Sequence, residues 1–243
     1  MRMLRRFFQA LKDIVYPKIC LGCKERIDRN AIDNLICRGC WQDIKRNIPP
    51  FCLSCGRTLK QGRFKKSICA DCVRHLRYFD RAFSPCIYTG VMQELIHQFK
   101  YKGKNYLALP LSKIMIEFIK EYDIPIEYMD FIVPVPLHNV RLREREFNQA
   151  EILARYIAEE FKKPLLKDLL VRSHPTRTQT KLATQKRILN VKGCFAIKNR
   201  ELVSGKKVLL VDDVLTTGAT SSEAAFSLKD AGANIVFVMT LAN

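Results

Sequence analysis

Four Cys-x-x-Cys pairs in the first third of the chain constrain its fold more than any other feature. The pairs are Cys20/Cys23, Cys37/Cys40, Cys52/Cys55 and Cys69/Cys72. Thirteen residues separate the first pair from the second, and thirteen separate the third from the fourth, which indicates an internal repeat. Two thiolates on one turn, placed against two on another, form the tetrahedral set that structural Zn²⁺ prefers. We expect adjacent pairs to share a metal, one with two and three with four, although a crossed arrangement also fits.

Other roles for the eight thiols fit the sequence less well. Disulfides are typical of secreted proteins, and the sequence shows no secretory signal with a small-residue cleavage site. An iron–sulfur cluster also uses four thiolates, but pairs thirteen residues apart are more typical of a zinc ribbon. Because every ligand of each ion would be a protein thiolate, the metal would be structural rather than catalytic. Residues 17–75 are therefore predicted to form a double zinc ribbon with two zinc ions.

Residues 1–16 precede the cysteine pairs and place their apolar side chains on one helical face. We expect an amphipathic helix that docks on the protein, with binding to a membrane surface or to a partner as the alternative. The chain has no run of about 18 apolar residues, so we expect no transmembrane segment and a cytoplasmic location.

A second constraint lies near the end of the chain, where an apolar run meets a loop of small residues. Residues 208–211 are all apolar, which predicts a strand buried on both faces, as in a parallel sheet. Asp212 and Asp213 follow at the expected end of the strand. Residues 216–220 form a Thr-rich loop, and residues 219–231 have the apolar spacing of a helix. Strand, loop and helix in this order predict a binding site at the end of a parallel strand.

The chemistry of this loop points to a phosphorylated sugar. Backbone N–H groups of a small-residue loop and a helix N-terminus bind phosphate, and Gly218 permits close approach of the backbone. Two adjacent carboxylates would repel an anion unless the ligand also carries hydroxyl groups, for which carboxylates are good acceptors. The alternative is that Thr220 and Glu223 form a capping box that only starts the helix.

The remainder of the second part alternates between strand and helix patterns. We expect strands at 131–136, 169–171 and 235–241, helices at 91–99, 105–122 and 149–161, and a connecting segment at 73–90. This alternation predicts that residues 76–243 form an α/β domain with a parallel sheet flanked by helices. Lys100 to Lys104 could meet phosphates or form a solvated helix end, and Cys86 and Cys194 are predicted core residues.

The charge of the chain favours polyanionic partners. Lys and Arg number 42 against 24 Asp and Glu, which gives a formal charge of +18. Arg63, Lys65 and Lys66 lie among aromatic residues in the ribbon region, a composition suited to single-stranded nucleic acid. The alternative is that these aromatic residues, which are Phe51, Phe64, Tyr78 and Phe79, pack the small ribbon core.

The stretch from Asp212 to Thr220 resembles the phosphoribosyl pyrophosphate (PRPP) loop of type I phosphoribosyltransferases. The whole chain resembles the ComF family of competence proteins, in which a double zinc ribbon precedes a phosphoribosyltransferase-like domain. Besides the loop and the Cys pairs, the resemblance rests on Pro134-Val135-Pro136, Arg145 with Phe147-Asn148-Gln149, Arg177-Thr178-Gln179, Arg187 and Asn190. This chain has Glu146 where members of that family commonly have Gly.

The resemblance implies roles for individual residues. Asp212 and Asp213 would bind the ribose hydroxyls and stabilise positive charge on the ribose, which makes them the predicted catalytic residues. The predicted phosphate ligands are Thr216, Thr217, Gly218, Ala219 and Thr220, and the predicted pyrophosphate-side loop is Val135, Pro136, Leu137 and His138. Arg145 and Arg177 would bind the diphosphate together with Mg²⁺, and residues 177–187 would form a mobile hood.

The resemblance also implies a function. The protein is expected to bind PRPP, to act in DNA uptake during natural transformation, and to bind single-stranded DNA. Competence or DNA-processing proteins would be its partners. The alternative is an active phosphoribosyltransferase of nucleotide or base metabolism without a role in DNA uptake. The acceptor base cannot be inferred from the residues.

Overall fold

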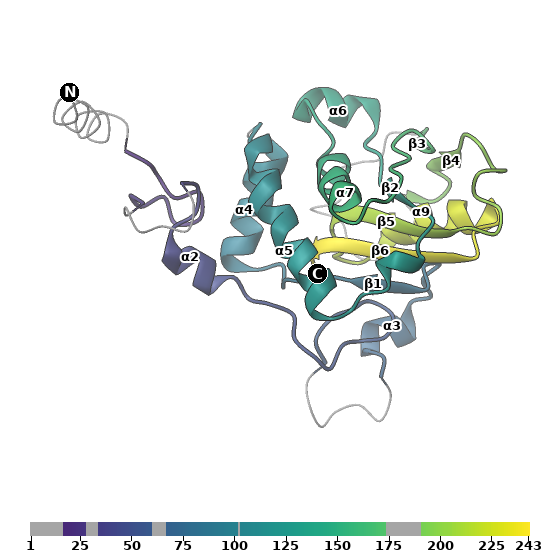
Figure 1. Cartoon of the computed structure of the whole chain (residues 1–243), viewed down its shortest axis with the longest axis horizontal. Helices are drawn as coiled ribbons and strands as arrows, with labels where there is room; N and C mark the ends of the chain where they lie inside the picture. The colour runs from purple at the N-terminus through teal and green to yellow at the C-terminus, as the bar shows by residue number, and fades with distance from the viewer. Residues whose placement is uncertain (1–16, 28–33, 60–66, 102, 174–190) are drawn as a thin grey trace.

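The computed structural model describes residues 17–27, 34–59, 67–101, 103–173 and 191–243 (Figure 1). Its centre is a parallel sheet with the strand order β1-β6-β5-β2. The bounds of these strands are Arg81–Phe83 for β1, Phe131–Pro134 for β2, Lys207–Val214 for β5 and Ile235–Ala242 for β6. All three neighbouring pairs are parallel, so the predicted sheet type is confirmed.

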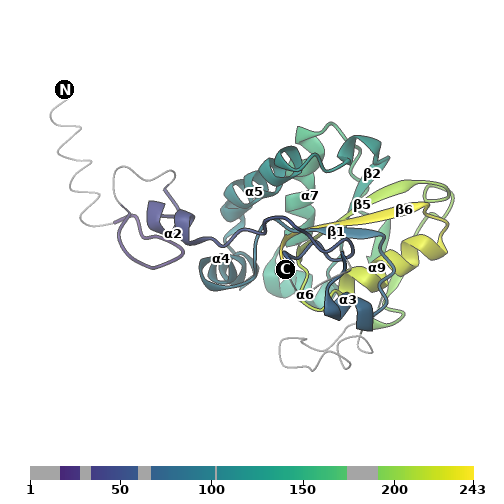
Figure 2. The same cartoon turned by 90° about the horizontal axis from the view of Figure 1, so that it is seen from below.

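Alternating side chains of β5 fill the core on both faces of the sheet. Leu209 and Val211 pack in one apolar cluster with side chains of α5 (Ala108–Glu121) and α7 (Gln149–Glu160). Val208 and Leu210 pack in a second cluster with side chains of α9 (Ala219–Asp230). Viewed from below, α5 and α7 lie on one side of the sheet and α9 on the other (Figure 2). The covered faces explain why the strand is apolar without interruption.

The strand β5 is longer than the apolar run predicts. Pairing with β6 continues past Val211, with Asp212 opposite Thr240 and Val214 opposite Ala242. The predicted end of the strand at Val211 was therefore wrong, because both Asp212 and Asp213 lie within β5, which ends at Val214. Their positions are fixed by the sheet rather than by a loop.

Three further elements depart from the predictions. The segment 73–90, expected only to connect two domains, contains the edge strand β1, which pairs with β6. Strand β3 (Leu170–Arg172) pairs antiparallel with β4 (Phe195–Ile197) in a separate small sheet, and β4 was not predicted. Helix α6 (Asn139–Arg145) was also missed, because its residues are mostly charged and show no apolar face. Helix α4 (Gly90–Tyr101) corresponds to the helix predicted at 91–99.

The two halves of the cysteine-rich region dock on different elements of the sheet domain. Their short helices, α2 (Arg38–Asp43) and α3 (Ala70–Arg74), lie apart in both views (Figures 1 and 2). The first half contacts α4, where Lys24 forms an ion pair with Glu94 at 2.8 Å. The second half contacts β1, where the Ala82 N–H donates to the carbonyl of Ser54 at 2.7 Å. Gly56 has a φ of 69°, and a Cβ there would overlap the Ala82 carbonyl, so this contact requires glycine.

The structure decides between the two interpretations of the aromatic residues only in part. Phe79 is buried, and Phe51 packs edge-on against Phe118 and Tyr122 at ring distances of 5.8 and 5.1 Å. Neither of these two rings is confined to a ribbon core, since Phe51 packs on α5 and its C-terminal end and Phe79 belongs to the apolar cluster that includes β5 and α9. Tyr78 is 45% exposed. Phe64, together with Arg63, Lys65 and Lys66, lies outside the described residues.

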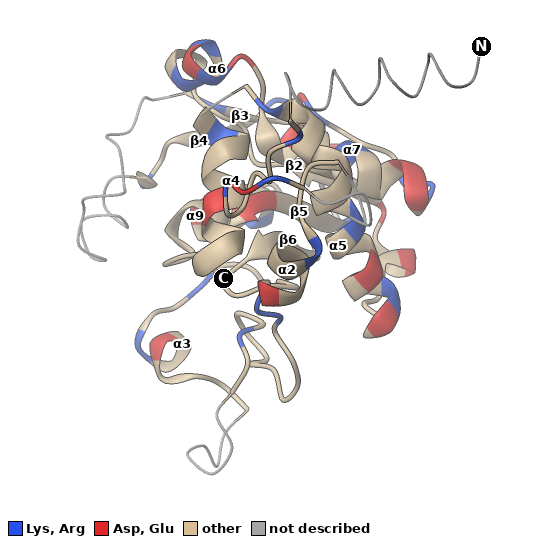
Figure 3. Ribbon diagram, turned by 90° about the vertical axis from the view of Figure 1, so that its left-hand side faces the viewer, with Lys and Arg blue, Asp and Glu red and all other residues tan. Residues whose placement is uncertain are grey.

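The structure also bears on the predictions for the two unpaired cysteines and for the distribution of charge. Cys86 and Cys194 are buried as predicted, and burial raises the pKa of the Cys86 thiol to about 12. The helix predicted at 1–16 lies outside the described residues. None of the helices in the described part of the chain combines the length and hydropathy that a membrane crossing requires. Lys and Arg are distributed over many elements rather than concentrated on one, and α6 carries both signs of charge (Figure 3).

Candidate functional site

A cavity of about 460 Å³ lies where β5 and β2 end. Many of the predicted ligand-binding residues line it: Val135, Pro136, Leu137, Arg145, Asp212, Asp213, Thr216, Thr217, Gly218, Ala219 and Thr220. Arg141 and Arg172, which the sequence did not assign to a site, also line it, together with Lys100 and Tyr101 of the cluster for which phosphate contact was one of two alternatives. The carboxyl ends of parallel strands are the usual ligand sites of such folds.

The loop 216–220 leads directly into the N-terminus of α9. Gly218 has a φ of 74° and is the N-cap of the helix, with no side-chain cap. The alternative of a capping box is wrong, because the N-cap is Gly218 rather than Thr220, and Glu223 accepts a hydrogen bond from the N–H of Gly193 at 2.6 Å. The N-terminus of α9, a helix of 12 residues, lies at the cavity wall, and its Ala219 N–H donates a long hydrogen bond of 3.4 Å to the Thr217 hydroxyl. This geometry suits a bound anion.

The two carboxylates at the cavity floor differ in their electrostatic surroundings. Asp213 forms an ion pair with Lys100 at 2.7 Å, and both side chains are mostly withdrawn from solvent. Within the described part of the chain Asp212 forms no ion pair, and it accepts hydrogen bonds from the Asp213 N–H at 2.8 Å and the Ser221 hydroxyl at 3.3 Å. Burial, and then repulsion from Asp213, raise the pKa of Asp212 to about 7. The pair therefore carries less negative charge than two free carboxylates.

The other end of the cavity is lined by arginines. Arg145 is 7% exposed, lies over the ring of Tyr101 at 4.9 Å, and donates to the Gln149 amide oxygen at 3.1 Å. Arg141 is half-buried, and burial together with the charges of Arg145 and Arg172 lowers its pKa. Among the described residues, neither Arg141 nor Arg145 forms an ion pair with a carboxylate. A multiply charged anion would relieve the repulsion within this cluster.

Hydrogen bonds made by the motif Phe147-Asn148-Gln149 support the groups that line the cavity. The Asn148 amide donates to the carbonyl of Val135 at 3.1 Å, and its oxygen accepts from the Ala150 N–H as the N-cap of α7. Gln149 donates to the carbonyl of Phe99 while it accepts from Arg145. The motif therefore positions the loop after β2 and the guanidinium of Arg145.

His138, a predicted pyrophosphate-side residue, and Glu146, which stands where the resembled family commonly has Gly, lie at the two ends of α6. The ring of His138 caps α6 by accepting a hydrogen bond from the Val140 N–H at 3.3 Å. Glu146 ends α6 in the left-handed region with a φ of 69°, which explains why glycine is suited to this position. Arg177 and the stretch 177–187 lie outside the described residues.

The missed residues gave weak signals in the sequence. Lys100 and Tyr101 belong to a basic cluster for which a solvated helix end was an equal alternative. Arg141 belongs to a charged stretch without periodicity, and Arg172 directly follows the short strand predicted at 169–171, although the structure places it within β3. Only the tertiary fold shows that these side chains line the same cavity.

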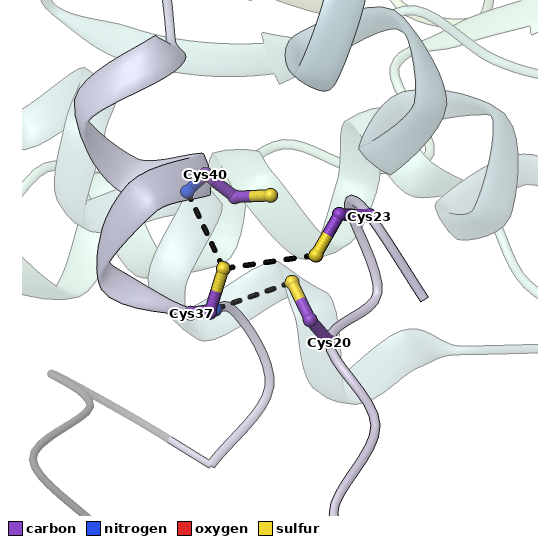
Figure 4. Close-up of side chains that lie close together, drawn as sticks. All are labelled: Cys20, Cys23, Cys37 and Cys40. Carbon is purple, nitrogen blue, oxygen red and sulfur yellow. Dashed lines mark hydrogen bonds between the residues drawn. The ribbon is translucent and has the colours of Figure 1, made fainter. Parts of the chain in front are cut away.

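The eight thiols form two separate groups (Figure 4 shows the first). One group is Cys20, Cys23, Cys37 and Cys40, and the other is Cys52, Cys55, Cys69 and Cys72, which is the sequential grouping. Within each group all sulfurs lie within 4.8 Å of one another. The Cys23–Cys37 and Cys55–Cys69 sulfur distances are 3.8 and 3.7 Å. A tetrahedral Zn²⁺ with bonds of about 2.3 Å requires sulfur distances of about 3.8 Å, so the donor set fits zinc.

Backbone N–H groups favour the thiolate form in the first group. Burial alone would raise the pKa of the Cys20 thiol, but backbone N–H donors, Cys37 first among them, outweigh burial and lower the pKa to about 6. The Gly22 and Cys37 N–H groups lie 3.3 and 3.2 Å from the Cys20 sulfur. Such N–H···S contacts prepare the sulfur for a cation.

Two family models match the chain. A double zinc ribbon domain matches residues 11–73, and a phosphoribosyl transferase domain matches residues 148–243. These matches and the geometry above confirm the predicted fold class.

Curated relatives are similar over nearly their full lengths. Competence protein F of Haemophilus influenzae is 26% identical, covering 92% of this chain and 96% of the relative. DNA utilization protein YhgH of Salmonella typhimurium is 28% identical, covering 94% and 98%. Competence protein ComFC of Bacillus subtilis is 27% identical, covering 90% and 91%. Together with the two domain matches, these relatives confirm the predicted resemblance to the ComF family.

A solved structure of a glutamine PRPP amidotransferase from B. subtilis is also similar to part of the chain. The identity is 26%, and the match covers 46% of this chain and 22% of that one, with a TM-score of 0.32. The fold assignment here rests on the strand order and the family models.

Proposed function

We propose that this ComF-like chain, organised as an N-terminal segment 1–16, a ribbon region 17–75 and a sheet domain 76–243, binds PRPP and acts in DNA uptake. One observation carries the proposal of the ligand. The cavity combines a helix N-terminus, a pair of carboxylates and a cluster of arginines. A sugar with a phosphate at one end, a diol and a diphosphate at the other end matches these three features in chemistry.

Each part of the ligand is assigned to a set of side chains and backbone groups. The 5′-phosphate binds the loop 216–220 and the N-terminus of α9. The ribose hydroxyls donate to Asp212 and Asp213. The diphosphate binds at the loop 135–137 and at Arg141 and Arg145, with Arg177 as a further ligand from outside the described residues.

Magnesium is proposed to bind together with PRPP rather than as a resident ion of the protein. Asp213 is already paired with Lys100, so the described carboxylates leave few oxygen atoms for a resident cation. The diphosphate itself is a strong Mg²⁺ ligand. We propose that Mg²⁺ arrives with the diphosphate and lowers its charge, while the arginines neutralise the remainder.

If the chain is a transferase, the reaction is a displacement at C1′ of the ribose. The bond between C1′ and the diphosphate oxygen breaks, the diphosphate leaves with the bonding electrons, and a nitrogen nucleophile forms the new bond. Arg141 and Arg145 would stabilise the departing charge, and ionised Asp212 would stabilise positive charge on the ribose. The alternative within this proposal is that PRPP is only a ligand.

A thermal-shift screen tests the proposed ligand. PRPP with Mg²⁺ should raise the melting temperature, because a ligand at 100 times its Kd adds about 2.7 kcal/mol to the free energy of unfolding. Ribose 5-phosphate and pyrophosphate should give smaller shifts. Release of pyrophosphate from PRPP with a panel of bases would then separate a transferase from a protein that only binds PRPP. No shift with PRPP would contradict the proposal.

The proposed role in DNA uptake is supported by the names of the relatives and by the charge of the chain. Relatives are named Competence protein F, Competence protein ComFC and DNA utilization protein YhgH. The formal charge of +18 favours association with nucleic acid. On this proposal single-stranded DNA binds the ribbon region, and competence or DNA-processing proteins are partners.

Titration of a labelled oligo-dT at several salt concentrations tests the DNA role. We expect the logarithm of affinity to fall with the logarithm of salt concentration by about 0.7 per phosphate contacted. Reversal of Arg63, Lys65 and Lys66 to Glu should weaken binding and flatten this slope. Absence of binding at low salt would favour the alternative of a metabolic phosphoribosyltransferase without a DNA role.

A further inference from the structure

The segment that follows the second thiol group reaches the back of the loop 216–220. Arg77 lies five residues after Cys72, and its Nη1 donates a hydrogen bond to the carbonyl of Thr217. The same guanidinium lies so close to Gly218 that a Cβ at this position would overlap Nη1. Gly218 is therefore required both for its left-handed φ and for the approach of Arg77.

Tyr78, the next residue of the same segment, contacts the first turns of α9. The Tyr78 N–H donates to the hydroxyl of Ser222 at 3.0 Å, and the Tyr78 ring packs on Phe226 at 4.8 Å. The guanidinium of Arg77 also lies 5.8 Å from the ring centre of Phe79, which is buried. Three consecutive residues thus hold the phosphate loop and α9 from outside the cavity.

The other end of the segment is held by the second thiol group. Cys69 caps α3 and Cys72 lies within it, and the sulfurs of both belong to the second group. Helix α3 has only five residues and no buried side chain, so packing does little to hold it. Four thiolates on one ion would fix its position. The first thiol group packs near α4, and no described hydrogen bond joins it to the loop 216–220.

We propose that Arg77 is a positioning residue that couples the second zinc site to the anion-binding loop. The guanidinium holds the Thr217 carbonyl away from the cavity and thereby keeps the N–H groups of the loop directed toward the ligand. Loss of metal from the second thiol group releases α3 and Arg77, and anion affinity falls. Loss of metal from the first group leaves anion affinity unchanged. This inference rests on the proposed function only in taking the loop as a phosphate site.

The coupling is reciprocal by thermodynamic necessity. If zinc at the second group strengthens anion binding at the loop, an anion at the loop strengthens zinc binding at the second group by the same factor. A ligand of the loop should therefore slow the release of one zinc ion and not of the other.

The first test compares Arg77→Ala with Arg81→Ala, using ribose 5-phosphate as the probe in calorimetric titrations. Arg81 is the matched control, because its guanidinium also lies over a phenylalanine ring, that of Phe83 at 4.9 Å, whereas the described hydrogen bond to the Thr217 carbonyl comes from Arg77. We expect Arg77→Ala to bind about tenfold more weakly or worse, and Arg81→Ala to bind as the wild type. Millimolar guanidinium should restore affinity to Arg77→Ala, which a general loss of stability would not allow.

The outcomes separate this inference from the proposed function. A wild-type chain that fails to bind ribose 5-phosphate contradicts both. A wild-type chain that binds, with Arg77→Ala and Arg81→Ala equally unaffected, overturns the coupling alone. The same holds if both variants weaken binding equally without rescue by guanidinium.

A second measurement covers the case in which Arg77→Ala does not fold. Zinc release from the wild type to a colorimetric chelator is followed with and without ribose 5-phosphate. We expect two phases of release, of which the ligand slows one. Phases that the ligand leaves unchanged would overturn the proposal.

Discussion

Replacing Asp212 by Asn should stabilise the fold while it removes ligand binding. The reason is the cost of ionising a carboxyl group at this position. Burial and Asp213 raise the pKa of Asp212 from its ordinary value of 3.8 to about 7. Because the folded pKa is the higher one, the unfolded chain loses this proton first as pH rises. The free energy of unfolding therefore falls between about pH 4 and pH 7, and the loss is complete above pH 7.

The magnitude follows from the size of the pKa change. At about 1.4 kcal/mol per pH unit, a carboxyl pKa raised by about three units costs about 4 kcal/mol above pH 7. Asn cannot ionise and keeps an oxygen that accepts the Asp213 N–H. We therefore expect Asp212→Asn to gain about 2 to 4 kcal/mol at pH 8, and less than about 2 kcal/mol at pH 5. Such a gain is expected where a site holds a charge for function rather than for stability.

Urea unfolding of both chains at pH 5, 6, 7 and 8, with zinc in excess, measures this difference. The zinc ligands are the same in both chains, so their own titration cancels in the comparison. Asp230→Asn is the control for the loss of one negative charge, because this carboxylate is exposed at the other end of α9, where it forms an ion pair with Arg200 at 2.9 Å. It should change the free energy of unfolding by less than about 1 kcal/mol, as is usual for an exposed ion pair. A variant Asp212→Asn that is no more stable than the wild type at pH 8, or whose gain in stability does not shrink toward pH 5, would show that ionisation of Asp212 does not destabilise the fold.

Three further predictions concern the metal, the α6 terminus and the arginine cluster. Protein purified without chelator should contain about two zinc ions per chain by elemental analysis, and a chain without zinc would contradict the metal assignment. A strong chelator should make the ribbon region sensitive to protease. Glu146→Gly should raise the free energy of unfolding, measured with urea, by up to about 1 kcal/mol, because glycine adopts the left-handed φ without strain. The control Glu144→Gly, within α6, should lower it by about 1 kcal/mol, and equal effects of the two changes would argue against strain at Glu146. Arg141→Gln should weaken PRPP binding about tenfold or more in calorimetry but leave ribose 5-phosphate within about threefold, and equal losses for both ligands would remove Arg141 from the diphosphate end.

The sequence predicted those features that depend on neighbours along the chain. The thiol pairs are local turns with a fixed spacing, and the strand, loop and helix around Gly218 are contiguous, so their chemistry could be inferred without a fold. The apolar run of β5 also revealed that both faces of the sheet are covered. The end of β5 was misplaced because pairing with β6, rather than polarity, decides how far the strand extends.

The features that could not be predicted depend on residues far apart in sequence. Lys100 meets Asp213 across more than a hundred residues, and Arg77 meets Thr217 across 140. Strand β1 has only three residues, too few for a recognisable pattern, and its pairing with β6 makes it part of the sheet. The left-handed φ of Glu146 has no signal in a charged helix, although the resemblance had marked this position as unusual.

Calorimetric titration of PRPP with Mg²⁺ into the zinc-loaded chain shows whether the carboxylate pair and the loop 216–220 form one ligand site. We expect one PRPP to bind per wild-type chain. We expect no measurable binding to the double variant Asp212→Ala, Asp213→Ala, whose fold is verified by circular dichroism and zinc content. Absence of binding to the wild type, or undiminished affinity in the folded double variant, would show that these groups do not form a PRPP site.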